Sequence, residues 1–356
     1  MAEEDTKGSG PVAERHRFDT EALHRWLDAT VEGYHGPLSV EQFRGGQSNP
    51  TFKLITPQRC YVMRAKPGPV AKLLPSAHAI EREYRVLAAL HGSEVPVARV
   101  YGLCEDESVI GRAFYVMEHV DGRIFWQQSL PESNKTERSA IYDEMNRVIA
   151  ALHRIDYQAV GLEGYGRPGN YLSRQIGRWS KQYVASETES IPEMDRLIDW
   201  LPAHIPAHDE TTIVHGDYRL DNVVFAHDAP KVIAVLDWEL STLGSPLADF
   251  AYHAMSYHIP AEQFRGIAGF DHKALGIPTE KEYIARYCER TGRAGIDHWD
   301  FYLAYNAFRL AAILQGIMKR VVDGTAASTG GLDAGKRAKP LAKIAWTLAQ
   351  RAGAGD

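Results

Sequence analysis

A short segment of the chain holds an aspartate and an asparagine at a fixed spacing between two apolar runs. The segment is His215-Gly216-Asp217-Tyr218-Arg219-Leu220-Asp221-Asn222, and Leu236-Asp237-Trp238-Glu239 follows after further apolar residues. Phosphoryl transfer from ATP needs one group that orients or deprotonates the acceptor hydroxyl, and two oxygen ligands for the magnesium ion on the phosphates. Asp217, Asn222 and Asp237 can supply these groups if one loop carries the first two and a strand end carries the third. The pattern therefore favours phosphoryl transfer.

Each residue of this set also has a structural explanation. An aspartate after a strand is common in turns, so only the combination of spacings favours Asp217 as the base. Asp237 follows the apolar run 232–236, where a carboxylate is costly unless it is paired or binds a metal. We assign His215 to the scaffold of the loop. Asp221 is off the spacing and is expected to be a turn or solvent-facing residue.

Length and composition limit the class of protein. The 356 residues are too many for one simple core, and we expect two lobes. Apolar residues make up 44% and charged residues 24%, with a formal net charge of −6, so the chain shows no basic footprint for nucleic acid. The three cysteines are far apart and odd in number, which suits a reducing compartment and disfavours a zinc site.

The chain shows no pattern that predicts membrane insertion. Its apolar runs are shorter than a bilayer span, and residues 1–17 are polar, without the apolar core of a signal peptide. We interpret residues 1–17 as a disordered leader and expect a cytoplasmic protein without a membrane partner.

The residues that follow this leader predict a small α+β lobe over 18–120. Helices are expected at 18–31 and 78–90, where apolar residues recur at helical spacing. Short alternating runs predict strands within 43–54 and at 60–64, 96–103 and 113–119. The sheet is expected to be antiparallel, with one helix inserted between its strands.

From residue 121 to 356 the pattern predicts a larger, mostly helical lobe that carries the catalytic loop and the acceptor site. The expected helices are 138–152, 171–185, 281–290, 299–322 and 341–351. Short strands are expected at 213–215, 223–225 and 232–236.

A glycine-rich turn and a pair of cations in the smaller lobe are candidates for phosphate binding. Backbone N–H groups of such a turn can bind phosphates, and its residues are Gly45, Gly46, Gln47, Ser48 and Asn49. A plain hairpin turn is the alternative. Arg64 or Lys66, at a strand end, can hold the α- and β-phosphates, and Glu83 in the next helix can fix the cation by an ion pair. Surface charge is the alternative for these residues.

The segment 115–122 is expected to join the lobes. An extended chain there can bind the edge of an adenine through the Glu118 carbonyl and the Val120 amide, with Met117 lining the pocket.

These motifs, with Gly244-Ser245-Pro246-Leu247-Ala248-Asp249, resemble those of the aminoglycoside phosphotransferase and choline kinase superfamily, over roughly residues 38–320. The resemblance implies the two-lobed protein-kinase-like fold, with ATP and Mg²⁺ as cofactors. It implies Asp217 as the base, Asn222 and Asp237 as magnesium ligands, and Asp249 as structural support. Arg64 stands where the family usually has a lysine, and the two cations are not interchangeable. Whether Arg64 or Lys66 contacts phosphate is therefore open.

Several stretches are similar to one branch of that superfamily, the kinase-like domain that precedes acyl-CoA dehydrogenase domains in fused proteins. They are 46–52, 61–64, 114–123 and 171–179. This resemblance implies phosphorylation of the hydroxyl of a hydroxyacyl-CoA, best matched by a 4-hydroxyacyl-CoA, and an acyl-CoA dehydrogenase as a partner. Arg174, Arg178 and Lys181 form a cationic row at helical spacing, which can receive CoA phosphates or be a solvated face.

Two other functions remain open from the sequence. The first is an aminoglycoside or choline-like amino-alcohol kinase, although carboxylates that would bind such a polycation are sparse after Asp249. The second is a nucleotide-binding, non-catalytic partner module for a dehydrogenase. The presence of Asp217, Asn222 and Asp237 together disfavours it.

Overall fold

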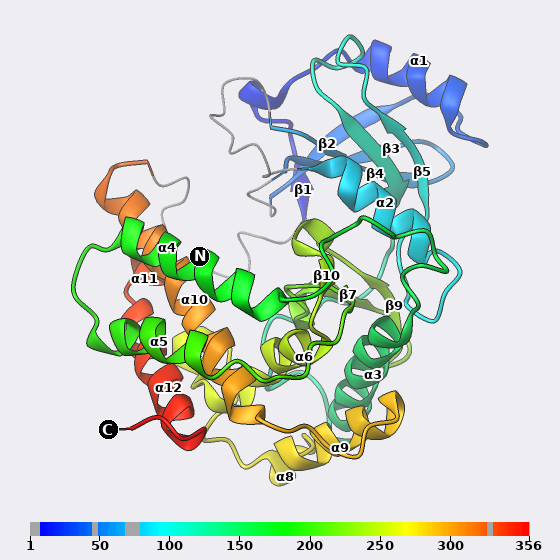
Figure 1. The fold of residues 1–356 in the computed structure, drawn as a ribbon. Coiled ribbons are helices and arrows are strands. Elements are labelled where there is room, and N and C mark those ends of the chain that lie inside the picture. Colours follow the sequence, from blue (N-terminus) through cyan, green and yellow to red (C-terminus); the bar gives the residue numbers. More distant parts are fainter. Residues whose placement is uncertain (1–7, 45–48, 68–78, 326–329, 356) are drawn as a thin grey trace. The chain divides into compact units, whose positions relative to one another are not determined.

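The fold is that of a computed structural model, which describes residues 8–44, 49–67, 79–325 and 330–355. It has two compact units (Figure 1). The N-terminal unit contains residues up to Gly122 together with Ile233–Glu239, and the C-terminal unit contains Arg123–Val232 and the chain from Leu240 onward. The prediction placed the division after residue 120 and did not foresee that 233–239 return to the first unit.

A six-stranded antiparallel sheet forms the centre of the N-terminal unit, in the order β1-β2-β3-β4-β6-β5. The strands are β1 (Ser9–Gly10), β2 (Ser39–Phe43), β3 (Thr51–Ile55), β4 (Cys60–Ala65), β5 (Val100–Cys104) and β6 (Phe114–Glu118). The helical elements are the 3-10 turn η2 (Glu14–His16) and the helices α1 (Thr20–Thr30) and α2 (Ile80–Leu90).

The two faces of β4 have different partners. Tyr61, Met63 and Ala65 are buried in one core cluster with Leu23 and Leu27 of α1. Since side chains alternate along a strand, Arg64 lies on the other face, where it meets Glu83 of α2. The alternation therefore separates the apolar core from the polar contacts of Arg64.

The described part of the predicted leader is ordered. Ser9 and Gly10 pair with Phe43 and Gln42 of β2, and the amide of Ala13 donates to Gln42 Oε1. The expectation of disorder is corrected for residues 8–17, because backbone pairing with a sheet edge needs no apolar residue. Residues 1–7 of the predicted leader lie outside the described residues.

The C-terminal unit is mostly helical. Its longer helices are α3 (Lys135–Arg154), α4 (Tyr171–Ser186), α5 (Pro192–Ala203), α6 (Pro246–Ala254), α9 (Glu280–Thr291), α10 (Trp299–Val322) and α12 (Ala338–Arg351). Shorter elements are η5 (Met255–His258), α7 (Ala261–Phe264), α8 (His272–Leu275) and α11 (Gly331–Gly335). The predicted fold class, a small antiparallel sheet with a larger helical part, is confirmed.

Short strands and turns interrupt these helices around the predicted catalytic loop. They are β7 (Thr212–Val214), η3 (Leu220–Asn222), β8 (Val223–Phe225), β9 (Val232–Val235), η4 (Trp238–Leu240) and β10 (Thr242–Gly244). β7 pairs antiparallel with β10. The division between the two units runs through β9.

Local chemistry explains where several helices begin. Asp19 caps α1 by accepting from the amides of Glu21 and Ala22, and Thr279 forms a capping box with Glu282 at α9. Ser245 caps α6, and Pro246 occupies its first turn, where a missing N–H has no cost. This start fixes the phase of α6, which carries two residues of the candidate site.

Candidate functional site

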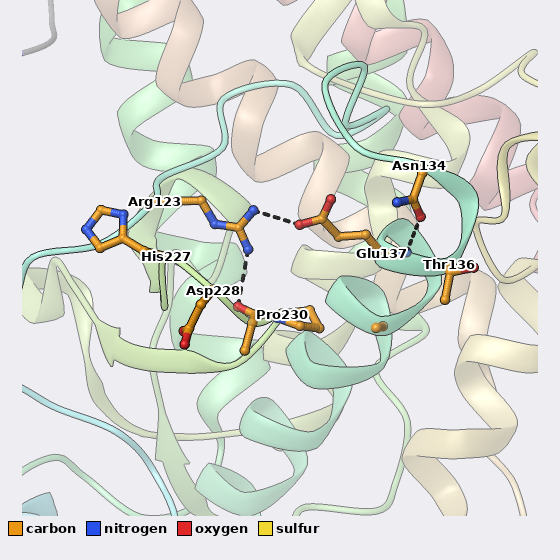
Figure 2. Close-up of a pocket in the computed structure, with 9 residues that line it drawn as sticks. Arg123, Asn134, Thr136, Glu137, His227, Asp228 and Pro230 are labelled. Carbon is orange, nitrogen blue, oxygen red and sulfur yellow. Dashed lines mark hydrogen bonds and ion pairs between the residues drawn. The ribbon is translucent and has the colours of Figure 1, made fainter.

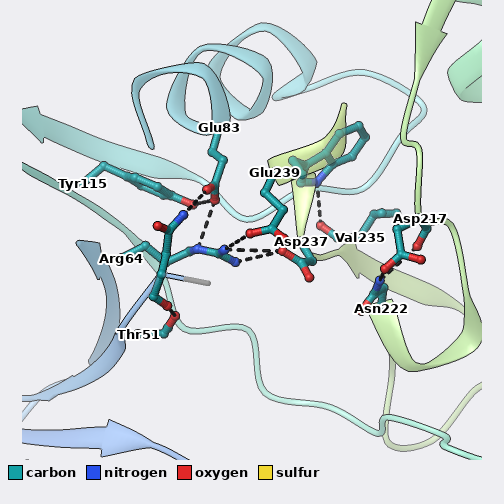
Figure 3. Close-up of polar contacts among 11 residues, drawn as sticks. Thr51, Arg64, Glu83, Tyr115, Asp217, Asn222, Val235, Asp237 and Glu239 are labelled. Atoms are coloured by element: carbon teal, nitrogen blue, oxygen red, sulfur yellow. Dashed lines mark hydrogen bonds and ion pairs between the residues drawn. The ribbon is translucent and has the colours of Figure 1, made fainter. Parts of the chain in front are cut away.

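The predicted catalytic loop connects β7 to β8 in the C-terminal unit. The side-chain amide nitrogen Nδ2 of Asn222 donates to the backbone oxygen of Asp217 at 2.9 Å and to Asp217 Oδ2 at 3.1 Å (Figure 3). Because Nδ2 is directed at Asp217, the carbonyl Oδ1 of Asn222 remains the atom that can act as an oxygen ligand. The five-residue spacing seen in the sequence thus places the two side chains in contact.

Asp249 of α6 holds the backbone of this loop. Its Oδ2 accepts from the amide of His215 and its Oδ1 from the amide of Gly216, each at 2.8 Å. His153 Nε2 lies 3.1 Å from Oδ2, and His153 Nδ1 lies 2.7 Å from the hydroxyl of Tyr287. Asp249 is an acceptor, so Nε2 carries the proton and Nδ1 accepts from the tyrosine. The role of structural support that the resemblance implied for Asp249 agrees with these contacts.

Electrostatics keep the buried Asp249 ionised. Burial alone would raise the pKa of its carboxyl, but the hydrogen bonds that it accepts from the His153 side chain and from the backbone amide of His215 outweigh this effect and lower it. His215 itself is buried, and its Nδ1 accepts from the amide of Asp217 at 3.2 Å. The predicted scaffold role of His215 agrees with this hydrogen bond.

Gly216 is required by the shape of the loop. Its φ of +82° lies in the left-handed region, and a Cβ there would stand 2.8 Å from the carbonyl oxygen of Leu240. Both conditions exclude a larger residue without a shift of the backbone.

The carboxylate of Asp217 has two further partners that the sequence did not indicate. The hydroxyl of Tyr252, on α6, donates to Asp217 Oδ1, and Arg219 Nε lies 3.1 Å from the same oxygen. Burial and the negative charge of Asp217 raise the pKa of Tyr252 well above its ordinary value, so the phenol stays protonated.

Asp221 was expected to be a turn or solvent-facing residue; it lies in the turn η3, but it does not face solvent. Its side chain is 5% exposed and forms ion pairs with Arg265 Nη1 and, at 3.4 Å, with Arg219 Nη2. Burial of this carboxylate is tolerated because two guanidinium groups compensate its charge. Arg219 therefore links Asp221 to Asp217.

In the N-terminal unit, Arg64 forms the ion pair with Glu83 that the order of strand cation and helix carboxylate predicted. Arg64 Nε lies 3.0 Å from Glu83 Oε2, and both side chains are buried (Figure 3). Glu83 also accepts from Asn49 Nδ2 at 2.9 Å and from the Tyr115 hydroxyl at 3.0 Å. Three donors thus converge on one carboxylate and hold it against Arg64.

The terminal nitrogens of Arg64 reach two more carboxylates of the same unit. Both Nη atoms lie 3.3 Å from Asp237 Oδ1, and Nη2 lies 3.5 Å from Glu239 Oε2 (Figure 3). Asp237 has a φ of +63°, an uncommon backbone conformation that aspartate tolerates better than most residues. Burial would lower the pKa of Arg64, but the surrounding Glu83, Tyr115, Asp237 and Glu239 raise it. Burial also raises the pKa of Glu83, although Arg64 opposes that shift.

Lys66 has a different partner. Its Nζ lies 3.1 Å from Glu81 Oε2, in a pair that is more than a third exposed at each end. Of the two cations that the sequence left open, Arg64 is the one joined to both Glu83 and Asp237.

The glycine-rich turn is only partly described. Gly45, Gly46 and Ser48, predicted to bind phosphate, lie outside the described residues. Asn49, predicted to add a phosphate donor, is buried, and its side-chain amide donates to Glu83 Oε1 at 2.9 Å. One of its two N–H groups is thus engaged by Glu83, and its role in phosphate binding stays a prediction.

Of the residues predicted to bind adenine, Met117 and Glu118 end β6, and Val120 follows outside regular structure. The amide of Glu118 donates to Arg99 O at 2.8 Å, and its carboxylate accepts from the amide of Arg99 at 3.3 Å. Val120 is half-buried. Its role in nucleotide binding remains a prediction.

The predicted cationic row on α4 is reduced to two residues. Arg174 donates through Nη1 to Gly169 O and through Nη2 to Arg167 O at 2.6 Å, so its guanidinium supports the start of the helix. Arg178 and Lys181 are exposed, and Arg178 also lies over the ring of Trp179. Arg178 and Lys181 are the two members of the row that we keep as candidates for binding an anionic ligand.

A pocket of about 330 Å³ lies at the first turn of α3 and the turn before β9 (Figure 2). Arg123 is its main cation, but the guanidinium already binds Glu137 at 2.6 Å, Ala226 O at 2.9 Å and Ala229 O at 3.2 Å. None of the predicted site residues lines this pocket. We therefore do not assign it to the reaction.

Comparison with known proteins decides the family. The model of the phosphotransferase enzyme family matches residues 39–301, about three quarters of the chain. This chain belongs to the phosphotransferase enzyme family. The predicted resemblance to the aminoglycoside phosphotransferase and choline kinase superfamily is thereby confirmed. As a member, the chain is a phosphotransferase.

Two relatives are similar over nearly the whole chain. Mouse acyl-CoA dehydrogenase family member 10 is 46% identical over 96% of this chain, but the match takes up 32% of the mouse protein. A Ralstonia eutropha crystal structure, described provisionally as an aminoglycoside phosphotransferase, is 65% identical and has a TM-score of 0.88, covering 94% of this chain and 99% of the other. The predicted branch is confirmed, and the chain spans less than half the length of the curated relatives it matches.

An aminoglycoside phosphotransferase in ternary complex with ADP and hygromycin B shares the fold at a TM-score of 0.60. The match covers 94% of this chain and 99% of the other at 15% identity, so it shows the fold alone. The predicted protein-kinase-like fold is confirmed. In the described part of the chain, no helix combines the length and apolarity that crossing a bilayer requires.

Proposed function

We propose that this phosphotransferase moves the γ-phosphoryl group of ATP to the hydroxyl of a hydroxyacyl-CoA. The observation that supports a hydroxyacyl-CoA as the acceptor is the similarity to mouse acyl-CoA dehydrogenase family member 10. In that protein the matching segment is about a third of a longer chain. A kinase and a dehydrogenase in one polypeptide would act on the same class of thioester. Phosphorylation makes the acceptor oxygen a leaving group for later chemistry.

The side chains around Asp217 support an acceptor that is not a polycation. Tyr252 and Arg219 bind the Asp217 carboxylate, and the buried Arg309 donates to the adjacent Gly216 carbonyl. The positive charges of Arg219 and Arg309 would repel a polycationic aminoglycoside. On α4, the exposed Arg178 and Lys181 are the groups we propose for the CoA phosphates.

The proposed roles follow the chemistry of each residue. Asp217 orients the acceptor hydroxyl and accepts its proton, while Arg64, fixed by Glu83, binds the nucleotide phosphates. Met117, Glu118 and Val120 are proposed to bind the adenine. ATP as the donor is supported by the fold shared with a structure that binds ADP.

Asn222 Oδ1 and the Asp237 carboxylate fit a magnesium ion by their chemistry. Both are hard oxygen donors, and the described residues hold no cluster of three or more His, Cys, Asp or Glu that could bind a metal alone. Such a sparse set suits Mg²⁺, which keeps waters and phosphate oxygens among its ligands. When bound, Mg²⁺ would neutralise charge on the phosphates.

An acceptor assay tests the proposal. With ATP and Mg²⁺, a 4-hydroxyacyl-CoA is expected to release ADP and gain one phosphate, measured by a coupled ADP assay and by mass spectrometry across chain lengths. The matched acyl-CoA without the hydroxyl is the control and should give no phosphorylated product. Preferred turnover of kanamycin or choline would favour the aminoglycoside or amino-alcohol kinase, which the Ralstonia similarity keeps as the second candidate. Nucleotide binding without turnover of any acceptor would favour a non-catalytic partner module.

The two cations of the N-terminal unit are expected to differ in nucleotide binding. Arg64→Lys keeps a charge but loses the planar fork that reaches Glu83 and Asp237 together, so the Kd for ATP should rise about tenfold. Lys66→Ala removes only the exposed pair with Glu81 and should change the Kd less than twofold. Titration with a fluorescent ATP analogue measures both values. A larger effect of Lys66→Ala would assign the phosphate contact to Lys66.

A further inference from the structure

Two buried side chains of the C-terminal unit converge on Asp217 from separate helices. Tyr252, on α6, is 5% exposed and donates its hydroxyl hydrogen bond to Asp217 Oδ1. Arg309, on α10, is 6% exposed, and its guanidinium carbon lies 5.0 Å from the centre of the Tyr252 ring. Neither residue belongs to the spacing pattern that identified Asp217.

Arg309 also binds the loop directly. Its Nη2 donates to the carbonyl oxygen of Gly216 at 2.7 Å, one residue before Asp217. Its guanidinium carbon also lies 5.8 Å from the centre of the Trp179 ring, on α4. Arg309 therefore contacts two aromatic rings as well as the backbone of the loop.

The hydrogen bonds on Asp217 leave little freedom to its carboxylate. Oδ1 accepts from Tyr252 and forms an ion pair with Arg219, and Oδ2 accepts from Asn222. A carboxylate oxygen has about two lone-pair positions, so Oδ2 keeps about one for an acceptor hydroxyl, while Tyr252 and Arg219 flank Oδ1.

We propose that Tyr252 and Arg309 are positioning residues that set the direction from which Asp217 meets the acceptor hydroxyl. The inference rests on the proposed role of Asp217 as the base. Tyr252 acts on the carboxylate itself, and Arg309 acts through the Tyr252 ring and the Gly216 carbonyl. Correct orientation of a base contributes to kcat, whereas nucleotide affinity does not depend on it.

Tyr252→Phe tests the inference with a small change, because it removes the hydroxyl and keeps the ring under Arg309. We expect kcat to fall about ten- to a hundredfold, the range for one hydrogen bond to a charged group, with the KM for ATP unchanged. A purely structural role would lower kcat no more than an equally destabilising substitution elsewhere in the same unit does.

Tyr257→Phe is the matched control. Tyr257 is equally buried in the same unit, and its hydroxyl donates to Pro278 O at 2.9 Å, away from the loop. It should lower the melting temperature as Tyr252→Phe does and leave kcat within twofold.

Arg309→Lys keeps the charge without the planar stack and should lower kcat. In the double variant with Tyr252→Phe, this effect should be less than multiplicative, because the two residues act on one group.

The outcomes separate this inference from the proposed function. If Asp217→Asn is inactive while Tyr252→Phe has wild-type kcat, the positioning role is overturned and the role of Asp217 stands. If Asp217→Asn retains wild-type turnover, the proposed base fails. A loss of kcat in Tyr257→Phe equal to that in Tyr252→Phe also overturns the positioning role, because it would reflect general destabilisation.

Discussion

Asp217→Asn is expected to lower kcat by at least about a hundredfold, the contribution typical of a general base. The asparagine cannot accept the hydroxyl proton. Its NH2 group also replaces either the oxygen next to Tyr252 and Arg219 or the oxygen that accepts from Asn222, so at least one of these contacts is lost. Nucleotide binding should remain, since no nucleotide contact is proposed for this side chain. Turnover by ADP release and ATP affinity by calorimetry measure the two quantities separately.

Asp221→Asn is the matched control for that substitution. Asp221 is a buried carboxylate four residues away and shares Arg219 with Asp217, but it is off the catalytic spacing. Its loss should reduce stability more than turnover. Asp217→Asn with turnover within tenfold of wild type would contradict the assignment of the base.

Asp249→Asn is expected to cost about 3–5 kcal/mol of unfolding free energy, as for a buried pair that loses one partner. Two backbone amides and the Nε2–H of His153 point at this carboxylate, and asparagine offers them only one acceptor oxygen. Urea denaturation measures the loss. Asp156→Asn, at an exposed aspartate that accepts from the amides of Gln158 and Ala159, should stay within about 1 kcal/mol.

The difference in unfolding free energy between wild type and Asp249→Asn should depend on pH, and the direction follows from the lowered pKa of Asp249. The pKa of Asp249 lies below its ordinary value of 3.8 in the folded state, so its carboxylate stabilises the protein above that value. The stabilisation is lost as pH falls through the folded-state pKa. The gap between wild type and Asp249→Asn should therefore shrink below about pH 4. A gap that stays constant down to pH 3 would show that the charge of Asp249 is not what stabilises the loop.

The parts of the fold with a clear periodic pattern were predictable from the sequence. α10 begins and ends at the residues that the apolar spacing indicated, Trp299 and Val322. α6 was missed because every one of its residues is buried, so it has no polar face to create a helical period. The same helix supplies Asp249 and Tyr252, and the sequence alone indicated only the first of these.

The contacts of the candidate site likewise fall into those that the sequence predicts and those that it does not. The contacts of Asn222 with Asp217 and of Glu83 with Arg64 follow from local spacing and from element order. The hydrogen bond of Tyr252 to Asp217 joins residues 35 positions apart, and no spacing rule predicts it. Arg174 looked like a ligand-binding cation because charge and helical phase do not reveal that a guanidinium already binds nearby carbonyl groups.

The course of the chain has a consequence for recombination between relatives. The N-terminal unit is made of two pieces, residues up to Gly122 and Ile233–Glu239, and the second piece carries both carboxylates that meet the terminal nitrogens of Arg64. A chimera joined at one crossover near residue 122 would combine the arginine of one parent with the carboxylates of the other. Functional exchange of this unit therefore needs both segments to come from the same parent. A parent with lysine at position 64 should tolerate a change of the carboxylates at 237 and 239 to a different degree than a parent with arginine there.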